Sequence, residues 1–448
     1  METTLFHRLP GVVFYGNFPD EINGFWNDTR TLQPGDCFLA LVAQRDGHDF
    51  LADAQRKGAS CAIVSRIDKN LTLPQLRVAD VFEAAKTIAK INRKNYIITA
   101  ITGSYGKTST KDMLKLLLRE NAYATEDNLN NELGVTLTLS RMKSQQFGVI
   151  EGGIDHPGEM DRIIDLVEPD ISITIGVTFT HVCNFTDFEQ LVKEKCKILE
   201  NTLLRKKIGI IAESCLTYAL FRRLANRCIV IGQDTNIQQF PRFTQFQFMG
   251  SDKIILRGKY FDNRIFALPE MSAGQKENFA KAATAAKILG LTDAAIQESI
   301  LGWKPGKMRG ETVYFQGHEV YLDCYNANPV AMEDALRYFD KKYCDEKTYV
   351  LGGMGELGEF SEEYHRKLAE YFCDKKNVII FAIGMEMQVF YDRLAAISGA
   401  MEIFYFEETA QAKAIFRKKI RGNIFIKGSQ CYRLWELLDN EIAECRKK

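Results

Sequence analysis

Apolar residues along the chain fall into short runs separated by polar segments, and strand-like and helix-like spacings alternate for most of its length. Apolar runs at 96–102 and 147–154 are each followed by a segment with helical spacing, the second of them at 158–167. Strands that alternate with helices are typical of a parallel, doubly wound sheet. Residues 240–268 interrupt the alternation, and their short runs predict antiparallel hairpins.

The same pattern divides the chain into three units. Residues 1–93 contain short strands and helices, and the polar, basic segment at 91–95 predicts a linker. Residues 94–305 contain the long alternating stretch, and residues 306–448 repeat it up to a terminal helix. We therefore expect an α/β fold of three domains, with a central, mostly parallel, doubly wound sheet and ligands bound between the domains.

Composition narrows the functional classes. The 448 residues are 46% hydrophobic and 26% charged, and 58 basic residues balance 58 acidic ones. Zero net charge argues against a nucleic-acid coat or a polybasic membrane binder, and no apolar run approaches the roughly 18 residues that span a bilayer. The first residues lack a secretory signal, and 11 cysteines without a C-x-x-C pair predict free thiols in a reducing cytoplasm. The six histidines are too dispersed for a histidine metal cage.

The strongest chemical signal is ITGSYGKTST at 101–110, between an apolar strand and an amphipathic helix. Glycines allow the backbone N–H groups to point at phosphate oxygens, and the start of the helix adds its positive end. The lysine can reach the β- and γ-phosphates, and the threonine after it is placed to bind Mg²⁺. The predicted phosphate-binding residues are Gly103, Ser104, Tyr105, Gly106, Lys107, Thr108 and Ser109.

This loop lacks one feature of the common nucleotide-binding pattern, because Ile101 stands where the first glycine would be. The alternative is a tight strand-to-helix turn with an accidental Gly-Lys-Thr. A motor or switch ATPase is disfavoured, since no strand ending in aspartate near a water-positioning residue is evident. We therefore predict a loop that binds the triphosphate of ATP.

Several segments together resemble the Mur ligases, the ATP-dependent amide-forming enzymes of peptidoglycan synthesis. GSYGKTST is similar to the family's G-T-x-G-K-T-[ST]-T loop. The other matching segments follow in the family's order over nearly the whole chain. They are NDTRTLQPGDCFLAL with DGHDF (27–50), DNLNNELGVTLTL (127–139), VIEGGIDHPGEM (149–160), LDCYNANPVAMEDAL (322–336) and VLGGMGELGEFSEEYH (350–365).

The resemblance implies a fold and a reaction. It implies a small N-terminal domain for a UDP-linked substrate, a central domain for ATP and Mg²⁺, and a Rossmann-like C-terminal domain that closes over the nucleotide. ATP would phosphorylate a carboxylate of a UDP-muramoyl peptide, and an amine would attack the acyl phosphate. HPGE and YNANP are similar to the member that adds D-alanyl-D-alanine to the tripeptide, so the implied partners are these small molecules. We expect no nucleic acid, no membrane span and a monomer.

The metal and catalytic residues are also implied by the resemblance. Thr108, Glu151, His181 and Lys195 correspond to metal-binding positions, and Lys107, His181 and Lys195 to catalytic ones. The family's equivalent of Lys195 is carbamylated, which requires a neutral amine and hence a lowered pKa. Each assignment has a plain alternative. Glu151 could form a surface ion pair, and His181 could be an ordinary polar histidine. Lys195 could lie on a solvated helix face, where Lys193 or Lys197 could be confused with it.

The resemblance extends to the nucleotide and the acceptor. Asn278 fits an adenine contact, Arg309 a phosphate contact and Asp323 a ribose contact, whereas an interdomain salt bridge is the alternative for Arg309. A purely structural turn is the alternative for the YNANP asparagines. The expected substrate-binding residues are Thr29, Arg30, Asp46, Gly47, His48, Asn130, Asn131, Asn326 and Asn328.

Five positions depart from the family pattern: Val42, Gly176, Gly274, Gly353 and Gln430. Most of them concern substrate recognition, and Gln430 cannot clamp a carboxylate as an arginine would. Two alternatives follow. One is a diverged paralogue that joins a different acid and amine in specialised metabolism, and the other is a non-catalytic partner that binds nucleotide. The retained phosphate loop and Glu151 favour an active ligase.

Overall fold

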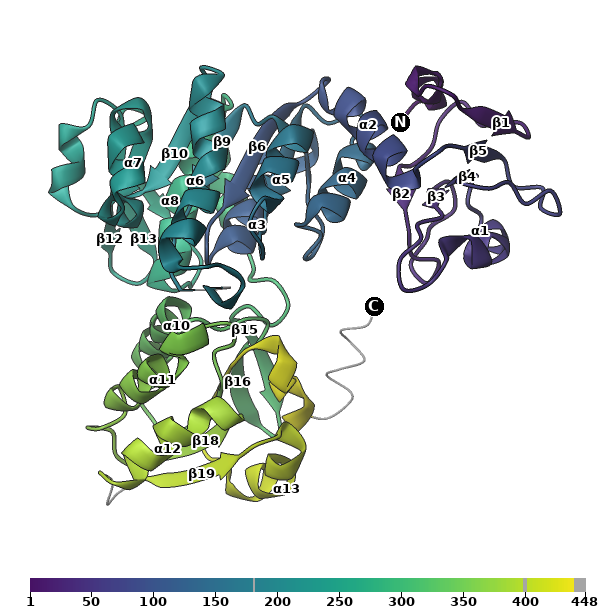
Figure 1. Cartoon of the computed structure of the whole chain (residues 1–448). Coiled ribbons are helices and arrows are strands. Elements are labelled where there is room, and N and C mark those ends of the chain that lie inside the picture. The colour runs from purple at the N-terminus through teal and green to yellow at the C-terminus, as the bar shows by residue number, and fades with distance from the viewer. Residues whose placement is uncertain (180–181, 398–400, 439–448) are drawn as a thin grey trace.

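The computed structural model describes residues 1–179, 182–397 and 401–438, and within these ranges the strands form three separate sheets. Figure 1 shows three lobes, with the central lobe in contact with each of the other two. The mixed α/β architecture with parallel-rich sheets confirms the predicted fold class. No helix of the described residues is long and apolar enough to cross a membrane.

The N-terminal lobe holds the smallest sheet. Its five described strands lie in the order β1-β5-β4-β3-β2, and all neighbours except β1 and β5 are parallel. Residues Gly47–Phe50 form a 3-10 turn immediately before α1. The elements are β1 (Val13–Tyr15), β2 (Phe25–Trp26), β3 (Cys37–Leu39), α1 (Leu51–Arg56), β4 (Cys61–Val64), β5 (Gln75–Arg77) and α2 (Val81–Arg93).

The segment predicted as a polar linker is instead the end of α2, packed against the central lobe. Asn92 donates from Nδ2 to the carbonyl of Leu139 at 2.8 Å, and Arg93 donates from Nε to the carbonyl of Val167 at 2.6 Å. Both side chains are buried, because their polar groups satisfy backbone carbonyls of the neighbouring helices. The linker prediction is therefore wrong, and the N-terminal lobe is held firmly against the central one.

The nine described strands of the central sheet lie in the order β14-β13-β12-β11-β10-β9-β6-β8-β7. Strands β6 to β12 pair in parallel, and β12, β13 and β14 form the predicted antiparallel hairpins. The elements are β6 (Ile97–Thr102), α3 (Lys107–Leu118), β7 (Ala122–Ala124), α4 (Glu132–Arg141), β8 (Phe147–Glu151), α5 (Glu159–Val167), β9 (Ile171–Thr174), α6 (Phe188–Leu204), β10 (Ile208–Ala212), α7 (Ala219–Leu224), β11 (Ile229–Gly232), β12 (Phe243–Met249), β13 (Lys253–Gly258), β14 (Phe261–Ala267), α8 (Ala273–Ile288) and α9 (Asp293–Ile300).

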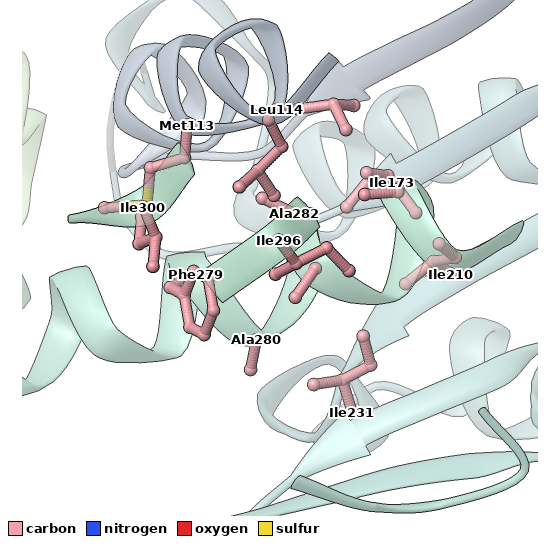
Figure 2. Close-up of a cluster of buried hydrophobic side chains, with 14 of the residues drawn as sticks. Met113, Leu114, Ile173, Ile210, Ile231, Phe279, Ala280, Ala282, Ile296 and Ile300 are labelled. Carbon is pink, nitrogen blue, oxygen red and sulfur yellow. The ribbon is translucent and has the colours of Figure 1, made fainter. Parts of the chain in front are cut away.

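The core beneath the phosphate loop joins α3, α8 and α9 to one face of this sheet. Small residues of α8 let it lie close to α3, and the apolar side of α3 faces the strands. Burial of a large apolar side chain in this core removes its surface from water, which stabilises the folded state by roughly 1.5–3 kcal/mol per side chain. Figure 2 shows Met113, Leu114, Phe279, Ala280, Ala282, Ile296 and Ile300 gathered with the strand residues Ile173, Ile210 and Ile231.

The C-terminal lobe has six described strands in the order β15-β16-β20-β17-β18-β19, parallel except for the β15–β16 hairpin. Only 3-10 turns, among them Leu434–Leu437, occupy the described part of the predicted terminal helix, and residues 439–448 lie outside the described chain. The elements are β15 (Glu311–Phe315), β16 (His318–Asp323), α10 (Pro329–Lys342), β17 (Lys347–Gly352), α11 (Ser361–Glu370), β18 (Val378–Ile383), α12 (Gln388–Ala395), β19 (Glu402–Phe406), α13 (Thr409–Lys419) and β20 (Asn423–Lys427).

Candidate active site

The predicted phosphate loop joins β6 to α3 and is shaped by two glycines. Gly106 caps α3 at φ 72°, a left-handed conformation that strains residues with a Cβ. A Cβ there would also lie 2.7 Å from the amide nitrogen of Asn278. At Gly103 a Cβ would lie 2.9 Å from the carbonyl oxygen of Gly176. The two glycines therefore give the loop a tightly bent backbone, which Asn278 and Gly176 contact closely.

Ser104 fixes this loop to the end of β9. Its backbone N–H donates to the carbonyl of Gly176 at 2.7 Å, and its hydroxyl donates to the carbonyl of Thr178 at 2.9 Å. Ser104 is buried, so these bonds satisfy its polar groups away from water. The start of α3 is thus held over the carboxyl ends of the parallel strands, where α/β sheets bind ligands.

Thr108 and Glu151 meet beneath the loop. The Thr108 hydroxyl donates to Glu151 Oε2 at 2.8 Å, and Asn130 Nδ2 donates to Glu151 Oε1 at 3.0 Å. Glu151 is the last residue of β8 and is only 2% exposed, so the surface ion pair considered as its alternative is wrong. Burying a carboxylate is costly unless hydrogen bonds or a cation compensate it.

The oxygen atoms of Thr108 and Glu151 suit a hard divalent cation such as Mg²⁺, which takes one or two carboxylates together with substrate phosphates and water. They lie at the base of the phosphate loop, so the residues present fit the implied ion. No group of three or more His, Cys, Asp or Glu side chains in the described part of the chain could hold a metal. His181, the further ligand suggested by the sequence, lies outside the described residues.

Two lysines converge on one carbonyl of the loop. Lys107 Nζ donates to the Gly103 oxygen at 2.9 Å, and Lys195 Nζ from α6 donates to the same oxygen at 3.3 Å. Lys195 is 1% exposed, and burial, reinforced by the charge of Lys107, lowers its pKa to about 7. Lys193 is exposed and Lys197 pairs with Asp161 and Glu194, so the three lysines of α6 have distinct environments.

A cleft of about 650 Å³ opens in front of the loop between the central and C-terminal lobes. It brings most of the candidate residues together, although they come from segments more than 300 positions apart. Lys195 lies behind the loop instead. From the predicted site the cleft is lined by Ser104, Tyr105, Gly106, Lys107, Thr108, Ser109, Asn130, Glu151, Asn278, Arg309, Asp323, Asn326 and Asn328, and also by Gly274 and Gln430.

On the C-terminal side of the cleft, Arg309 and Asp323 have defined partners. The Arg309 guanidinium lies over the Tyr325 ring, 3.9 Å from its centroid, which is a cation–π arrangement. Lys427 Nζ contacts Asp323 Oδ2 at 2.6 Å. Sequence reasoning missed Lys427, which is 1% exposed. Its place at the end of the parallel strand β20 could have pointed to it, since strand ends face the ligand.

Three of the asparagines also shape backbone. Asn131 caps α4 by accepting from Gly134 N at 2.9 Å, and Asn328 caps α10 by accepting from Ala331 N at 2.9 Å. The Asn326 side chain accepts from Ala327 N at 2.8 Å. The structural role considered for Asn326 and Asn328 is thus present, although both residues line the cleft as well.

The N-terminal candidates lie outside this cleft and are engaged within their own lobe. His48 Nε2 accepts from Ser65 N at 3.0 Å, so its Nδ1 donates to Asp46 Oδ1 at 2.7 Å. Arg66 binds the other oxygen of Asp46 and, with His48, holds the pKa of that carboxyl well below its usual range. At Gly47 a Cβ would lie 2.6 Å from the Leu41 carbonyl oxygen, so this segment forms a tight turn.

The two remaining N-terminal candidates lie at a neighbouring turn. Arg30 is exposed and pairs with Asp28 at 2.6 Å. Thr29 is buried, and its carbonyl accepts from Lys57 Nζ at 2.7 Å. Both residues contact only their own lobe in these interactions, so any role in substrate binding stays a prediction.

Comparison with known proteins identifies the family. Residues 101–264 match the model of the Mur ligase middle domain, and residues 308–429 match that of the Mur ligase, glutamate ligase domain. UDP-N-acetylmuramoyl-tripeptide--D-alanyl-D-alanine ligase of Rickettsia prowazekii is 30% identical over 82% of this chain and 84% of its own. The enzyme of that name from Escherichia coli is 30% identical over 92% of each chain. The chain belongs to the Mur ligase family.

Solved structures share the fold of this Mur ligase. MurF from Acinetobacter baumannii superposes with a TM-score of 0.80 at 24% identity, covering 100% of this chain and 99% of that one. MurF from Thermotoga maritima, solved in complex with ADP, gives 0.73 at 22% identity, covering 94% and 98%. The family assignment confirms the predicted enzyme class: the chain is an ATP-dependent ligase that forms amide bonds.

At three positions where this Mur ligase has glycine in place of a family residue, another side chain occupies the space. A Cβ at Gly176 would lie 2.7 Å from the Tyr105 hydroxyl, and one at Gly274 would lie 2.7 Å from Asp334 Oδ2. At Gly353 a Cβ would lie 2.6 Å from the Tyr432 hydroxyl. The side chains of Tyr105, Asp334 and Tyr432 thus fill the space beside these glycines. Val42, the fourth departure, is exposed on the N-terminal lobe.

Proposed function

We propose that this ligase joins D-alanyl-D-alanine to UDP-N-acetylmuramoyl tripeptide with cleavage of ATP to ADP and phosphate. The observation that carries the proposal is the arrangement of Thr108, Glu151 and Lys195 around a phosphate loop at an interdomain cleft. The printed names of the Rickettsia and Escherichia coli relatives support the choice of substrates.

The proposed chemistry has two steps. A carboxylate oxygen of the tripeptide attacks the γ-phosphorus, the bond from that phosphorus to the β–γ bridging oxygen breaks, and ADP leaves. The neutral amine of the dipeptide then attacks the acyl carbon, the carbon–oxygen bond to phosphate breaks, and a proton leaves the new amide nitrogen. A free carboxylate is a poor electrophile, so phosphorylation supplies the leaving group.

The contribution of the protein is to orient the reactants and to stabilise phosphate charge. The backbone N–H groups of Tyr105–Lys107 and the start of α3 would receive the phosphates, and Lys107 would leave its Gly103 contact to reach them. Thr108 and Glu151 would hold Mg²⁺, which neutralises phosphate charge when bound. Arg309 and Asn278 are proposed to contact the nucleotide, together with Asp323, and Asn130 to face the acceptor.

We also propose that Lys195 is carbamylated, as the resemblance implies. The step adds carbon dioxide to the neutral Nζ, forms an N–C bond and releases one proton. A pKa of about 7 makes a large fraction of this amine neutral near pH 7, whereas a solvated lysine is almost wholly protonated. Its burial beside Gly103 O would direct the new carboxylate toward the phosphate loop.

The three lobes would divide the work. Residues 1–93 would hold the UDP moiety, with Thr29, Arg30, Asp46, Gly47 and His48 as the candidate contacts. Residues 94–305 would bind ATP, and residues 306–448 would close over it and admit the dipeptide, excluding water from the acyl phosphate. Because ATP and UDP-linked sugars are cytoplasmic metabolites, the proposed reaction belongs in the cytoplasm. We also expect the enzyme to be a monomer.

A direct assay tests the proposal. Purified enzyme is mixed with ATP, Mg²⁺, UDP-muramoyl tripeptide and D-alanyl-D-alanine, and the products are followed by mass spectrometry together with ADP release. The expected result is the pentapeptide and one ADP per amide, with no ADP when either substrate is omitted. A Lys107→Ala variant should lose at least tenfold of the rate. ADP release without pentapeptide would sink the substrate assignment.

A second candidate is a paralogue that couples a different acid and amine. Gln430 at the cleft, together with Tyr432 in the space beside Gly353, is the observation that favours it. Neither side chain offers the rigid cation with which an arginine would clamp a carboxylate. Screening amino acids and dipeptides by ADP release would discriminate the candidates, since the paralogue would prefer an amine other than D-alanyl-D-alanine.

A further inference from the structure

Helix α10 of the C-terminal lobe faces the central lobe (Figure 1), and its side chains contact the segment that leads into α8. Three residues of α10 spaced four apart, and therefore on one side of the helix, reach this segment. Lys342 contacts Glu270 at 3.2 Å, burial and the same carboxylate together raise the pKa of Tyr338, and Asp334 accepts a hydrogen bond from Ser272. We call this row of Asp334, Tyr338 and Lys342 the α10 seam.

Asp334 is the end of the seam nearest the nucleotide cleft, which it lines. Its Oδ2 accepts from the Ser272 hydroxyl at 2.6 Å, and its Oδ1 accepts from the backbone N–H of Gly274 at 3.0 Å. Gly274 makes this approach possible, because a Cβ there would lie 2.7 Å from Oδ2. One lobe thus supplies a carboxylate to the first turn of a helix of the other lobe, where free N–H groups favour an anion.

The contact continues from α8 to the phosphate loop. Asn278 lies about one turn after Gly274 on the same helix, and its side-chain amide packs against Gly106 at the distance where a Cβ would clash. Gly106 in turn is the residue that caps α3 and precedes Lys107. A shift of the start of α8 would therefore move the group that supports the bend of the loop.

We infer that Asp334 is a positioning residue that sets the phosphate loop, through α8 and Asn278, in register with the C-terminal lobe across the nucleotide cleft. The inference rests on the proposed placement of ATP in that cleft. Burial raises the pKa of the Asp334 carboxyl, which is consistent with a group enclosed between two lobes. The seam thereby couples the orientation of the lobes to the shape of the phosphate site.

The test compares three variants of the full-length enzyme. Asp334→Ala removes both interlobe hydrogen bonds. Asp334→Asn keeps an acceptor for Gly274 N and offers a donor to the Ser272 hydroxyl, so it should rescue the geometry without the charge. Glu333→Ala is the matched control, because Glu333 is the preceding carboxylate on α10 and pairs with Arg337 of the same helix at 2.7 Å.

For each variant, kcat and KM for ATP, the affinity for ADP and the solution scattering of the ligand-free enzyme are measured. Asp334→Ala should lose at least tenfold in kcat/KM for ATP and in ADP affinity, and its radius of gyration should increase. Asp334→Asn should stay within about threefold of the wild type, and Glu333→Ala within about twofold.

The inference would be overturned if Asp334→Ala had the same ADP affinity, scattering and kcat/KM as the wild type. It would also be overturned if Asp334→Asn failed to restore the losses, or if Glu333→Ala reproduced them. A lowered Tm with unchanged ADP affinity and kcat/KM would show a merely structural contact and would also overturn it. Failure of the wild-type enzyme to make pentapeptide is a separate result. It refutes the proposed substrates, whereas the ADP and scattering measurements still decide the role of Asp334.

Discussion

Lys107 and Lys195 donate to the same backbone oxygen, that of Gly103, at 2.9 and 3.3 Å. Two ammonium groups that contact the same oxygen repel each other, and Lys195 is also buried, so the neutral form of Lys195 is favoured. Burial is the larger cause of the lowered pKa of Lys195, and Lys107 is the second. The pair thus prepares one amine for chemistry beside a loop suited to phosphate.

Carbamylation of Lys195 should depend on pH in the range set by its pKa of about 7. The neutral fraction rises from about 10% at pH 6 to about 90% at pH 8, since each unit changes the ratio tenfold. Carbon-13 NMR with labelled bicarbonate should therefore show a carbamate signal that grows over this interval. Lys195→Arg should abolish the signal, while Lys193→Arg on the exposed side of α6 should retain it. A signal that persists in Lys195→Arg would contradict the assignment.

The same lysine should reduce stability at low pH. Its folded pKa of about 7 lies below the usual 10.5, so between these values the unfolded chain binds more protons and stability rises with pH. The cost of the buried charge is fully present below pH 7. Lys195→Met should therefore raise the free energy of unfolding by a few kcal/mol at pH 6 and by less at pH 9.

Urea unfolding in bicarbonate-free buffer measures this difference. Lys193→Met is the control, because that side chain is exposed and should change stability by under about 0.5 kcal/mol at either pH. An equal gain at both pH values would show that Lys195 is not neutral when buried.

Glu151 should be needed for activation of the acid. Glu151→Gln keeps the shape and can still exchange hydrogen bonds with Thr108 and Asn130, but it removes the negative charge. We expect kcat to fall at least a hundredfold and the Mg²⁺ concentration for half-maximal rate to rise. Titrating Mg²⁺ in the ADP-release assay measures both. Glu363→Gln on the exposed face of α11 should change neither, and an unchanged Mg²⁺ requirement in Glu151→Gln would exclude this carboxylate as a ligand.

Substituting Gly176 should impair the enzyme, and a second substitution at Tyr105 should relieve the impairment. Gly176→Ala places a methyl group 2.7 Å from the Tyr105 hydroxyl and 3.0 Å from Cζ, so the Tyr105 side chain, which lines the cleft, must shift. We expect about a tenfold rise in KM for ATP. The double variant with Tyr105→Ala should recover most of the loss, because the obstructing ring is gone. If the double variant is as impaired as Gly176→Ala, crowding is not the cause.

Local sequence signals predicted the elements of the catalytic lobes well. Gly103 and Gly106 before Lys107 indicated a strand–loop–helix phosphate site, and the short runs at 240–268 indicated the hairpins of β12, β13 and β14. Such signals succeed because glycine freedom, apolar periodicity and helix starts are properties of a few consecutive residues. The same local reasoning failed for the segment at 91–95, in which Asn92 and Arg93 are buried against carbonyls of another lobe.

The sequence by itself determined the family, the α/β alternation and the loop that faces ATP, because these depend on residues adjacent in the chain. Only the tertiary structure decided which of three lysines on α6 is buried, which carboxylate joins the two lobes, and which side chains fill the space left by Gly176, Gly274 and Gly353. These choices depend on how helices and lobes pack together. Packing juxtaposes residues far apart in sequence, and neither composition nor spacing records those distances.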